Sequence, residues 1–134
     1  KALIKGLKEG TIDVISTDHT PITNELKKIE FDNAANGIIG LESAFGLLSK
    51  HIIPQIGLDT LIDKISTNPR KILKMKEVII REGEQANFTL FNPDLEWVFN
   101  ASDIESKSCN TPFIGQKLKV KALAILNNGK FKEC

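Results

Sequence analysis

The first half of the chain combines one short apolar stretch with helical patterns of apolar residues. Residues 12–15 are mostly apolar and are flanked by polar residues, which predicts a buried parallel strand. Residues 20–36 mix Pro, Asn, Lys and Glu with few periodic apolar positions, so we expect a loop there. From residue 41 to about residue 53 apolar side chains recur at helical spacing, and Pro54 is expected to end this helix.

Two further helices are expected before residue 75. The second is predicted by four apolar residues at helical spacing, which are Leu58, Leu61, Ile62 and Ile65. The third is expected to begin with Asn68 as its N-terminal cap and Pro69 at its first helical position.

From about residue 78 the apolar pattern changes to short alternating runs. Residues 86–91 alternate, residues 96–98 form a second short candidate, and residues 118–126 form a longer stretch rich in strand-forming residues. Asn128-Gly129 lies between two such runs and predicts a hairpin, because both central positions of such a turn need a positive φ. We therefore divide the chain into residues 1–75 and a small β domain of residues 76–134.

Composition adds few positive signals. The chain has 18 basic and 17 acidic residues, a net charge of +1 and no basic block, so we expect no nucleic-acid or membrane-surface partner. Its apolar runs are far shorter than the roughly 20 residues that a membrane-spanning helix needs. The two cysteines, Cys109 and Cys134, lack C-x-x-C spacing, which favours reduced thiols and a cytoplasmic location.

Asp18 is the most informative single residue. It follows the predicted strand directly, in the run Ser16-Thr17-Asp18-His19-Thr20-Pro21. A buried strand that ends in an acid is how an α/β barrel presents a catalytic group at its C-terminal mouth. An Asp before His-Thr-Pro can equally be a turn residue or a helix cap. The residues alone leave both interpretations open.

Five blocks of the chain, taken in order and spacing, give a more specific signal than any one motif. The resemblance that they carry is to the C-terminal part of dihydroorotase, a cyclic amidohydrolase with allantoinases and hydantoinases as neighbours. It covers nearly the whole chain. The blocks are residues 17–21 (Thr-Asp-His-Thr-Pro), 31–32 (Phe-Asp), 37–42 (Gly-Ile-Ile-Gly-Leu-Glu), 68–73 (Asn-Pro-Arg-Lys-Ile-Leu) and 106–115 (Ser-Lys-Ser-Cys-Asn-Thr-Pro-Phe-Ile-Gly).

The resemblance implies an α/β fold that is only partly present here. A (β/α)8 barrel takes about 250 residues, and 134 residues cannot supply one. We expect residues 1–75 to be the last β/α units of a TIM-type amidohydrolase barrel and residues 76–134 to be part of a small C-terminal β-sandwich. The chain is then a fragment without its natural N-terminus. A strand cut from a parallel barrel loses its neighbours, so we expect marginal stability or a homo-oligomer.

The resemblance also implies a reaction. Dihydroorotase interconverts N-carbamoyl-aspartate and dihydroorotate, the ring-closing step of pyrimidine synthesis, and Asp18 matches the residue that is both metal ligand and general base. Zinc is the usual metal of the family, commonly as a pair. The other family ligands, a His-x-His and further His residues, have no counterpart in this chain, and a catalytic zinc site needs about three protein ligands. We expect the fragment alone to be metal-free and inactive.

Substrate contacts transfer less completely. The family has a second His four residues after the Asp, contacting the substrate carboxylate, where this chain has Ile22. It commonly has Phe-Gly where this chain has Asn36-Gly37, in a loop whose backbone touches the substrate. His19 matches the family motif, and we interpret it as a packing or supporting residue. The loop of residues 20–36 is expected to lie over the site and close on the substrate.

Three functions follow from these matches and departures. Asp18 favours a zinc-dependent dihydroorotase that binds dihydroorotate and N-carbamoyl-aspartate. Ile22 favours either a non-catalytic homologue that serves as a structural partner, for example of aspartate carbamoyltransferase, or another cyclic amidohydrolase with an apolar substrate pocket, such as an allantoinase or hydantoinase. The block at residues 106–115 resembles dihydroorotases and allantoinases more than hydantoinases. Structurally, we expect it to pin the β domain to the barrel.

Overall fold

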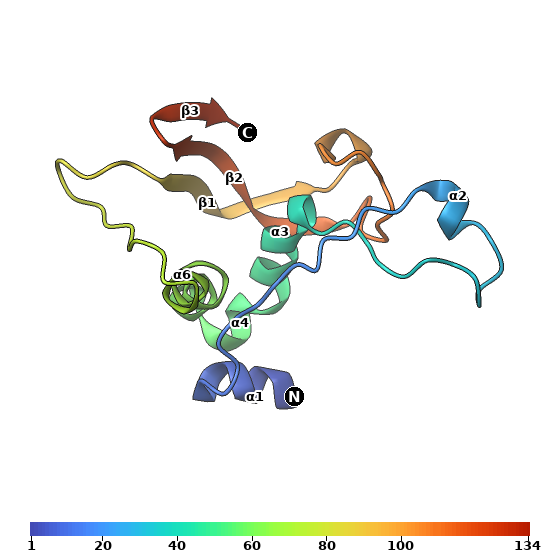
Figure 1. Ribbon diagram of the computed structural model, residues 1–134, viewed down its shortest axis with the longest axis horizontal. Helices are drawn as coiled ribbons and strands as arrows, with labels where there is room; N and C mark the ends of the chain where they lie inside the picture. The colour runs from blue at the N-terminus through green and yellow to red at the C-terminus, as the bar shows by residue number, and fades with distance from the viewer.

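The computed structural model describes residues 1–134, and its strands form one antiparallel sheet in the order β1-β2-β3 (Figure 1). The strands are β1 (Phe88–Val98), β2 (Lys117–Asn127) and β3 (Lys130–Glu133). The turn between β2 and β3 has positive φ at Asn128 (49°) and Gly129 (74°), which confirms the predicted hairpin. Residues 88–91 of the first short candidate and all of the second, residues 96–98, belong to the single strand β1.

Strand β1 contains a bulge in its middle. Asn92 pairs with Lys121 and Glu96 pairs with Lys119, so β1 has more residues between these pairs than β2 has. Pro93 lies in that bulge, where its missing N–H costs no ladder hydrogen bond. Opposite it, Val120 has a φ of 62°, an unusual value for a β-branched residue.

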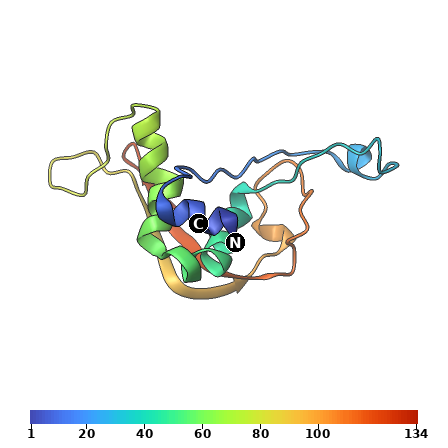
Figure 2. The same cartoon turned by 90° about the horizontal axis from the view of Figure 1, so that it is seen from below.

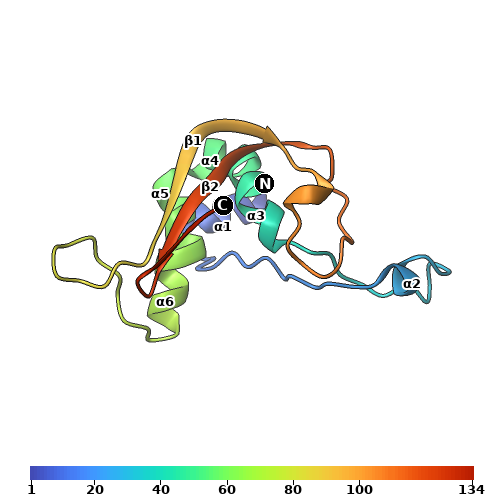
Figure 3. The same ribbon diagram turned by 90° about the horizontal axis from the view of Figure 1, so that it is seen from above.

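Helices α3, α4 and α5 lie under one face of the sheet, beneath the arch of β1 and β2 in Figure 3, and α3 packs against β2. Helix α3 confirms the predicted helix, although it ends at His51. Pro54 falls in the first turn of α4, where a missing N–H is tolerated, so it begins a short helix instead of ending the longer one. The helices are α1 (Ala2–Glu9), α2 (Asn24–Lys27), α3 (Leu41–His51), α4 (Ile53–Ile56), α5 (Leu58–Ile62), α6 (Asn68–Ile72), the π-helical segment Asp63–Thr67 and the 3-10 helix Ala101–Asp103.

The predicted cap at Asn68 is wrong. The π-helical segment Asp63–Thr67 joins α5 to α6 without a break, and Asn68 itself has helical φ and ψ of −66° and −44°. A residue inside a continuous helical run is not a cap. The Asn68 side chain instead donates to the backbone oxygen of Asp13 at 3.1 Å, which ties this helix to the stretch before Asp18.

The predicted strand at residues 12–15 is also not formed. The stretch is held by single contacts, such as the hydrogen bond from the Ile15 N–H to the Lys64 oxygen at 3.0 Å. The parallel pairing nearest to it is one isolated bridge between His19 and Ile38. A parallel strand needs neighbouring strands on its edges, and the 134 residues supply none beside residues 12–15.

The loop prediction for residues 20–36 is confirmed except for the four residues of α2, and Figure 2 shows this segment standing out from the body.

The apolar core is small and draws on the sheet region, on the segment before α3 and on α1 and α5. The fully buried apolar side chains include Phe99 and Leu118 from the sheet region and Ile39 before α3. Phe45 of α3 meets Phe91 of β1 edge to face, with ring centroids 5.1 Å apart. Many large apolar side chains stay exposed, among them Phe31 (93% exposed) and Ile80 (86% exposed).

None of the helices has the length and apolar character to cross a membrane. The division of the chain between residues 75 and 76 stays a prediction.

Gly46 sets how closely α3 approaches β2, and this gives a stability test. A Cβ at Gly46 would lie 3.0 Å from both Cβ and Cδ1 of Leu118. Alanine gains about 1 kcal/mol of helix propensity over glycine, but overpacking a core costs about 1–3 kcal/mol. We therefore expect Gly46→Ala to lower the urea midpoint of unfolding.

Gly6 of α1 provides the matched control. A Cβ there would lie 3.0 Å from Ile12 Cδ1, the far end of a flexible side chain. Gly6→Ala should therefore leave the midpoint unchanged or raise it. A Gly46→Ala midpoint at or above that of Gly6→Ala would mean that α3 and β2 do not pack this closely.

Candidate functional site

The loop of residues 106–111, between β1 and β2, brings together two segments from the first half of the chain. One is residues 17–22, which contain Asp18, and the other is residues 37–42, which lead into α3. All three segments overlap blocks that carried the sequence resemblance. We call their meeting point the junction, and it is held mainly by hydrogen bonds from polar side chains.

Asn110 is the hub of one half of the junction. Its Nδ2 donates to the backbone oxygens of Thr20 at 3.1 Å and Gly37 at 3.2 Å, and its Oδ1 accepts the Ile22 N–H at 3.1 Å. The Ser108 hydroxyl lies within hydrogen-bonding distance of both Asn110 Oδ1 and the Ile22 oxygen, and its one proton can serve either acceptor. The loop thus ties both N-terminal segments to the connection between β1 and β2, and the expectation that it pins a β domain to a barrel stays a prediction.

His19 forms the other half of the junction. Its Nδ1 accepts the backbone N–H groups of Gly40 at 3.0 Å and Leu41 at 3.3 Å, which are donors left over at the start of α3. An Nδ1 that accepts has no proton, so in the neutral ring the proton is on Nε2. Nε2 lies 3.4 Å from the Ser106 hydroxyl oxygen. Both ring nitrogens of His19 thus face groups of this chain, and its role as a packing or supporting residue stays a prediction.

Ser106 links His19 to Glu42. Both its hydroxyl and its backbone N–H, the latter at 2.8 Å, donate to Glu42 Oε1. Partial burial opposes ionisation of Glu42, but the hydrogen bonds from Ser106, together with the backbone N–H of Glu42 and the nearby His19, outweigh it and hold the pKa of this carboxyl below its ordinary value. The other oxygen, Oε2, is buried without a partner. Sequence reasoning did not single out Ser106 or Glu42, although both lie in the matched blocks.

Asp18 is exposed at the edge of the junction. Its φ is 46°, a left-handed conformation that Asp adopts more readily than most residues. The Thr20 hydroxyl donates to the Asp18 backbone oxygen at 3.0 Å, while the Asp18 carboxylate has no partner within the chain. No helix begins at Asp18, so the helix-cap interpretation is wrong. The carboxylate is free to act on a group outside these residues.

The three candidate substrate residues come from the two segments that Asn110 joins. Ile22 ends one segment, and Asn36 and Gly37 lie at the start of the other. Ile22 is half-buried and is held through its backbone, while Asn36 is exposed. Gly37 has a φ of 118°, and a Cβ there would lie 2.6 Å from Thr20 Cβ, so this position accepts only glycine without a shift of the backbone. Their contact with a substrate stays a prediction.

The residues of this chain do not fit a complete zinc site. A catalytic zinc needs about three protein ligands, and the structure contains no group of three or more His, Cys, Asp or Glu side chains that could hold a metal ion. Asp18 offers one carboxylate. Further ligands would have to come from residues outside this chain.

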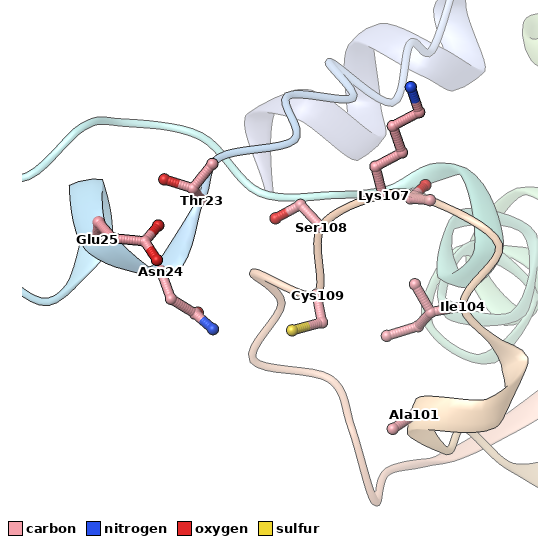
Figure 4. Close-up of a pocket in the computed structure, with 9 residues that line it drawn as sticks. Thr23, Asn24, Glu25, Ala101, Ile104, Lys107, Ser108 and Cys109 are labelled. Carbon is pink, nitrogen blue, oxygen red and sulfur yellow. The ribbon is translucent and has the colours of Figure 1, made fainter.

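A polar hollow of about 360 Å³ lies beside the junction, between the loop and the segment that begins α2 (Figure 4). Ser108 and Cys109 point from the loop toward Asn24 and Glu25. Ser106 also lines the hollow, whereas Asp18 does not. The hollow therefore adjoins the junction at Ser106 but does not reach the Asp18 carboxylate.

Comparison with known proteins finds relatives that match nearly the whole chain. No protein-family model matches the chain. A dihydroorotase of Chlorobaculum tepidum is 47% identical over 131 residues, which cover 96% of this chain and 30% of that relative. The chain thus spans about 30% of the length of the curated relatives that it matches.

Solved structures agree in fold. A dihydropyrimidinase from Brevibacillus agri superimposes with a TM-score of 0.84 at 24% identity, over 97% of this chain and 30% of that chain. An inactive dihydroorotase-like domain of a CAD-like multifunctional protein of Chaetomium thermophilum superimposes with a TM-score of 0.67 at 20% identity, over 97% of this chain and 34% of that chain. These likenesses show the fold, and the sequence identity over nearly the whole chain shows that it belongs to the dihydroorotase family of cyclic amidohydrolases.

Proposed function

We propose that the chain is the C-terminal part of a dihydroorotase, which interconverts N-carbamoyl-aspartate and dihydroorotate in pyrimidine synthesis. One observation carries this proposal. Asp18, at the position where the family has its general base, is exposed, lacks an internal partner, and lies on a backbone that the junction holds on its C-terminal side. The high identity to dihydroorotases over the same residues supports it.

The role of Asp18 follows from the chemistry of ring opening. Water adds to the amide carbon of dihydroorotate, the new C–O bond forms, and the C–N bond of the ring breaks. The attacking water must lose a proton and the leaving nitrogen must gain one. A carboxylate that reaches both can take the proton first and return it afterwards. Asp18 is the unpartnered carboxylate of the junction and is assigned this role.

The missing parts of the site are assigned to residues outside this chain. Zinc, which the resemblance implies, needs ligands that these residues do not supply, so the chain alone is expected to be inactive. Residues 1–75 are proposed as the last β/α units of the barrel, and residues 76–134 as part of the adjoining sandwich. Exposed apolar side chains such as Ile80 and Phe31 support burial against further chain or a second copy. The free thiols, Cys109 and Cys134, support a cytoplasmic setting.

Ile22 supports a second candidate, an amidohydrolase for uncharged rings. Its backbone is held at both N–H and carbonyl, so the side chain is what distinguishes this position from the family His. An apolar side chain cannot bind a substrate carboxylate. A hydantoin or allantoin ring would suit it better than dihydroorotate.

Asp18→Asn tests the general base in the full-length protein that contains this chain. The amide keeps the shape of the side chain but cannot take a proton. General acid–base catalysis is worth about 10²–10⁴-fold, so kcat for dihydroorotate should fall by at least about 100-fold. Asp13→Asn is the matched control, because Asp13 is exposed in the same stretch and should leave kcat unchanged. A fall of less than about tenfold for Asp18→Asn would exclude Asp18 as the base.

Ile22→His separates the two candidate substrates. If dihydroorotate is the substrate, the histidine restores the family contact and kcat/KM for dihydroorotate stays the same or rises. If the substrate is an uncharged ring, the histidine leaves a polar group beside an apolar ligand at a cost of about 1–3 kcal/mol. The measurement is kcat/KM for dihydroorotate and for a plain hydantoin, before and after the substitution. Loss on hydantoin with no turnover of dihydroorotate by either protein would rule out the dihydroorotase assignment.

A further inference from the structure

We propose that His19 and Ser106 are positioning residues that hold Asp18 in its working orientation, a role that rests on the proposed function of Asp18. The observation is a run of hydrogen-bonded groups that begins at the residue after Asp18 and ends on α3. It runs from the first backbone N–H groups of α3 to His19, then to Ser106, then to Glu42.

The direction of each hydrogen bond in this run is fixed. Ionised Glu42 can only accept, so the Ser106 hydroxyl donates to it. The Ser106 oxygen then has lone pairs for the proton on His19 Nε2, at 3.4 Å. On the opposite side of the ring, Nδ1 accepts two N–H groups of α3. The imidazole is therefore held at both nitrogens, and a flipped ring or the other tautomer would break the bonds at both ends.

The fixed ring acts on Asp18 through the backbone. The segment after Asp18 is anchored twice, by the His19 ring and by the parallel bridge between His19 and Ile38, which includes the Thr20 N–H to the Ile38 oxygen at 2.8 Å. On the other side, the Asp18 N–H has one long contact with Ser16 Oγ at 3.5 Å. The left-handed φ of Asp18 is thus set from its C-terminal side.

This arrangement matters because the Asp18 carboxylate has no side-chain partner of its own. Its direction depends on the backbone that carries it. A misplacement of about 1 Å at a catalytic group can cost about 100-fold in rate. A role in positioning therefore predicts a loss in kcat, whereas substrate affinity, which residues of the Asn110 hub would control, should change little.

The test uses Ser106→Ala and His19→Asn in the full-length protein with dihydroorotate as substrate. Ser106→Ala removes the link from His19 to Glu42. His19→Asn keeps an acceptor near the Nδ1 position for α3 and removes the Nε2–H. Both should lower kcat by about 10- to 100-fold with KM changed less than about twofold. Ser106→Thr keeps the hydroxyl, its methyl group can enter the neighbouring hollow, and it should restore at least half of the wild-type kcat.

Ser102→Ala is the matched control. Ser102 is exposed on the same connection between β1 and β2, so its substitution should leave kcat and KM unchanged. Wild-type kcat in Ser106→Ala would overturn the positioning role and leave the proposed function standing. A loss that Ser106→Thr does not rescue, with a lowered Tm in all Ser106 variants, would reduce Ser106 to a structural residue and also overturn it. If the wild-type protein does not turn over dihydroorotate, the proposed function fails and the positioning role fails with it.

Discussion

The hydrogen bonds of the 106–111 loop are the constraint on which the candidate site depends. Residues 17–22 and 37–42 meet each other at one short parallel bridge, and the loop adds polar contacts to both of them. Hydrogen bonds to charged acceptors, such as those from Ser106 to Glu42, contribute about 1.5–3 kcal/mol each. Without these contacts the stretch that carries Asp18 would be held only by the bonds of the His19 ring to the start of α3 and by the bridge to Ile38.

The contacts that hold the stretch around Asp18 are mainly polar, and Ile39 is the buried apolar side chain that the junction segments contribute to the core. The buried apolar side chains gather mainly where α3 meets β2, and the close approach at Gly46 belongs to that contact. Residues 12–18 cross the helices without joining a sheet. The core thus fixes α3 and the sheet, and the junction transmits that fixed geometry to Asp18 through the start of α3 and His19.

Locally encoded features could be predicted from the sequence. The hairpin at Asn128-Gly129 and the helix from Leu41 depend on neighbouring residues, and both are confirmed. The strand at residues 12–15 could not be predicted correctly, because a parallel strand depends on partners that these residues lack. Asn68 looked like a cap because the π-helical segment before it leaves no sequence signal. His19 binds the start of α3 across 21 residues of chain, a contact that no local pattern reveals.

A crystal structure of the full-length protein with dihydroorotate bound tests the central claim most directly. The account predicts that the Asp18 carboxylate lies within about 3.2 Å of the attacking water or the ring nitrogen. It also predicts that His19 still bridges the start of α3 and Ser106. An Asp18 carboxylate turned away from the substrate, with His19 released from both partners, would contradict the account.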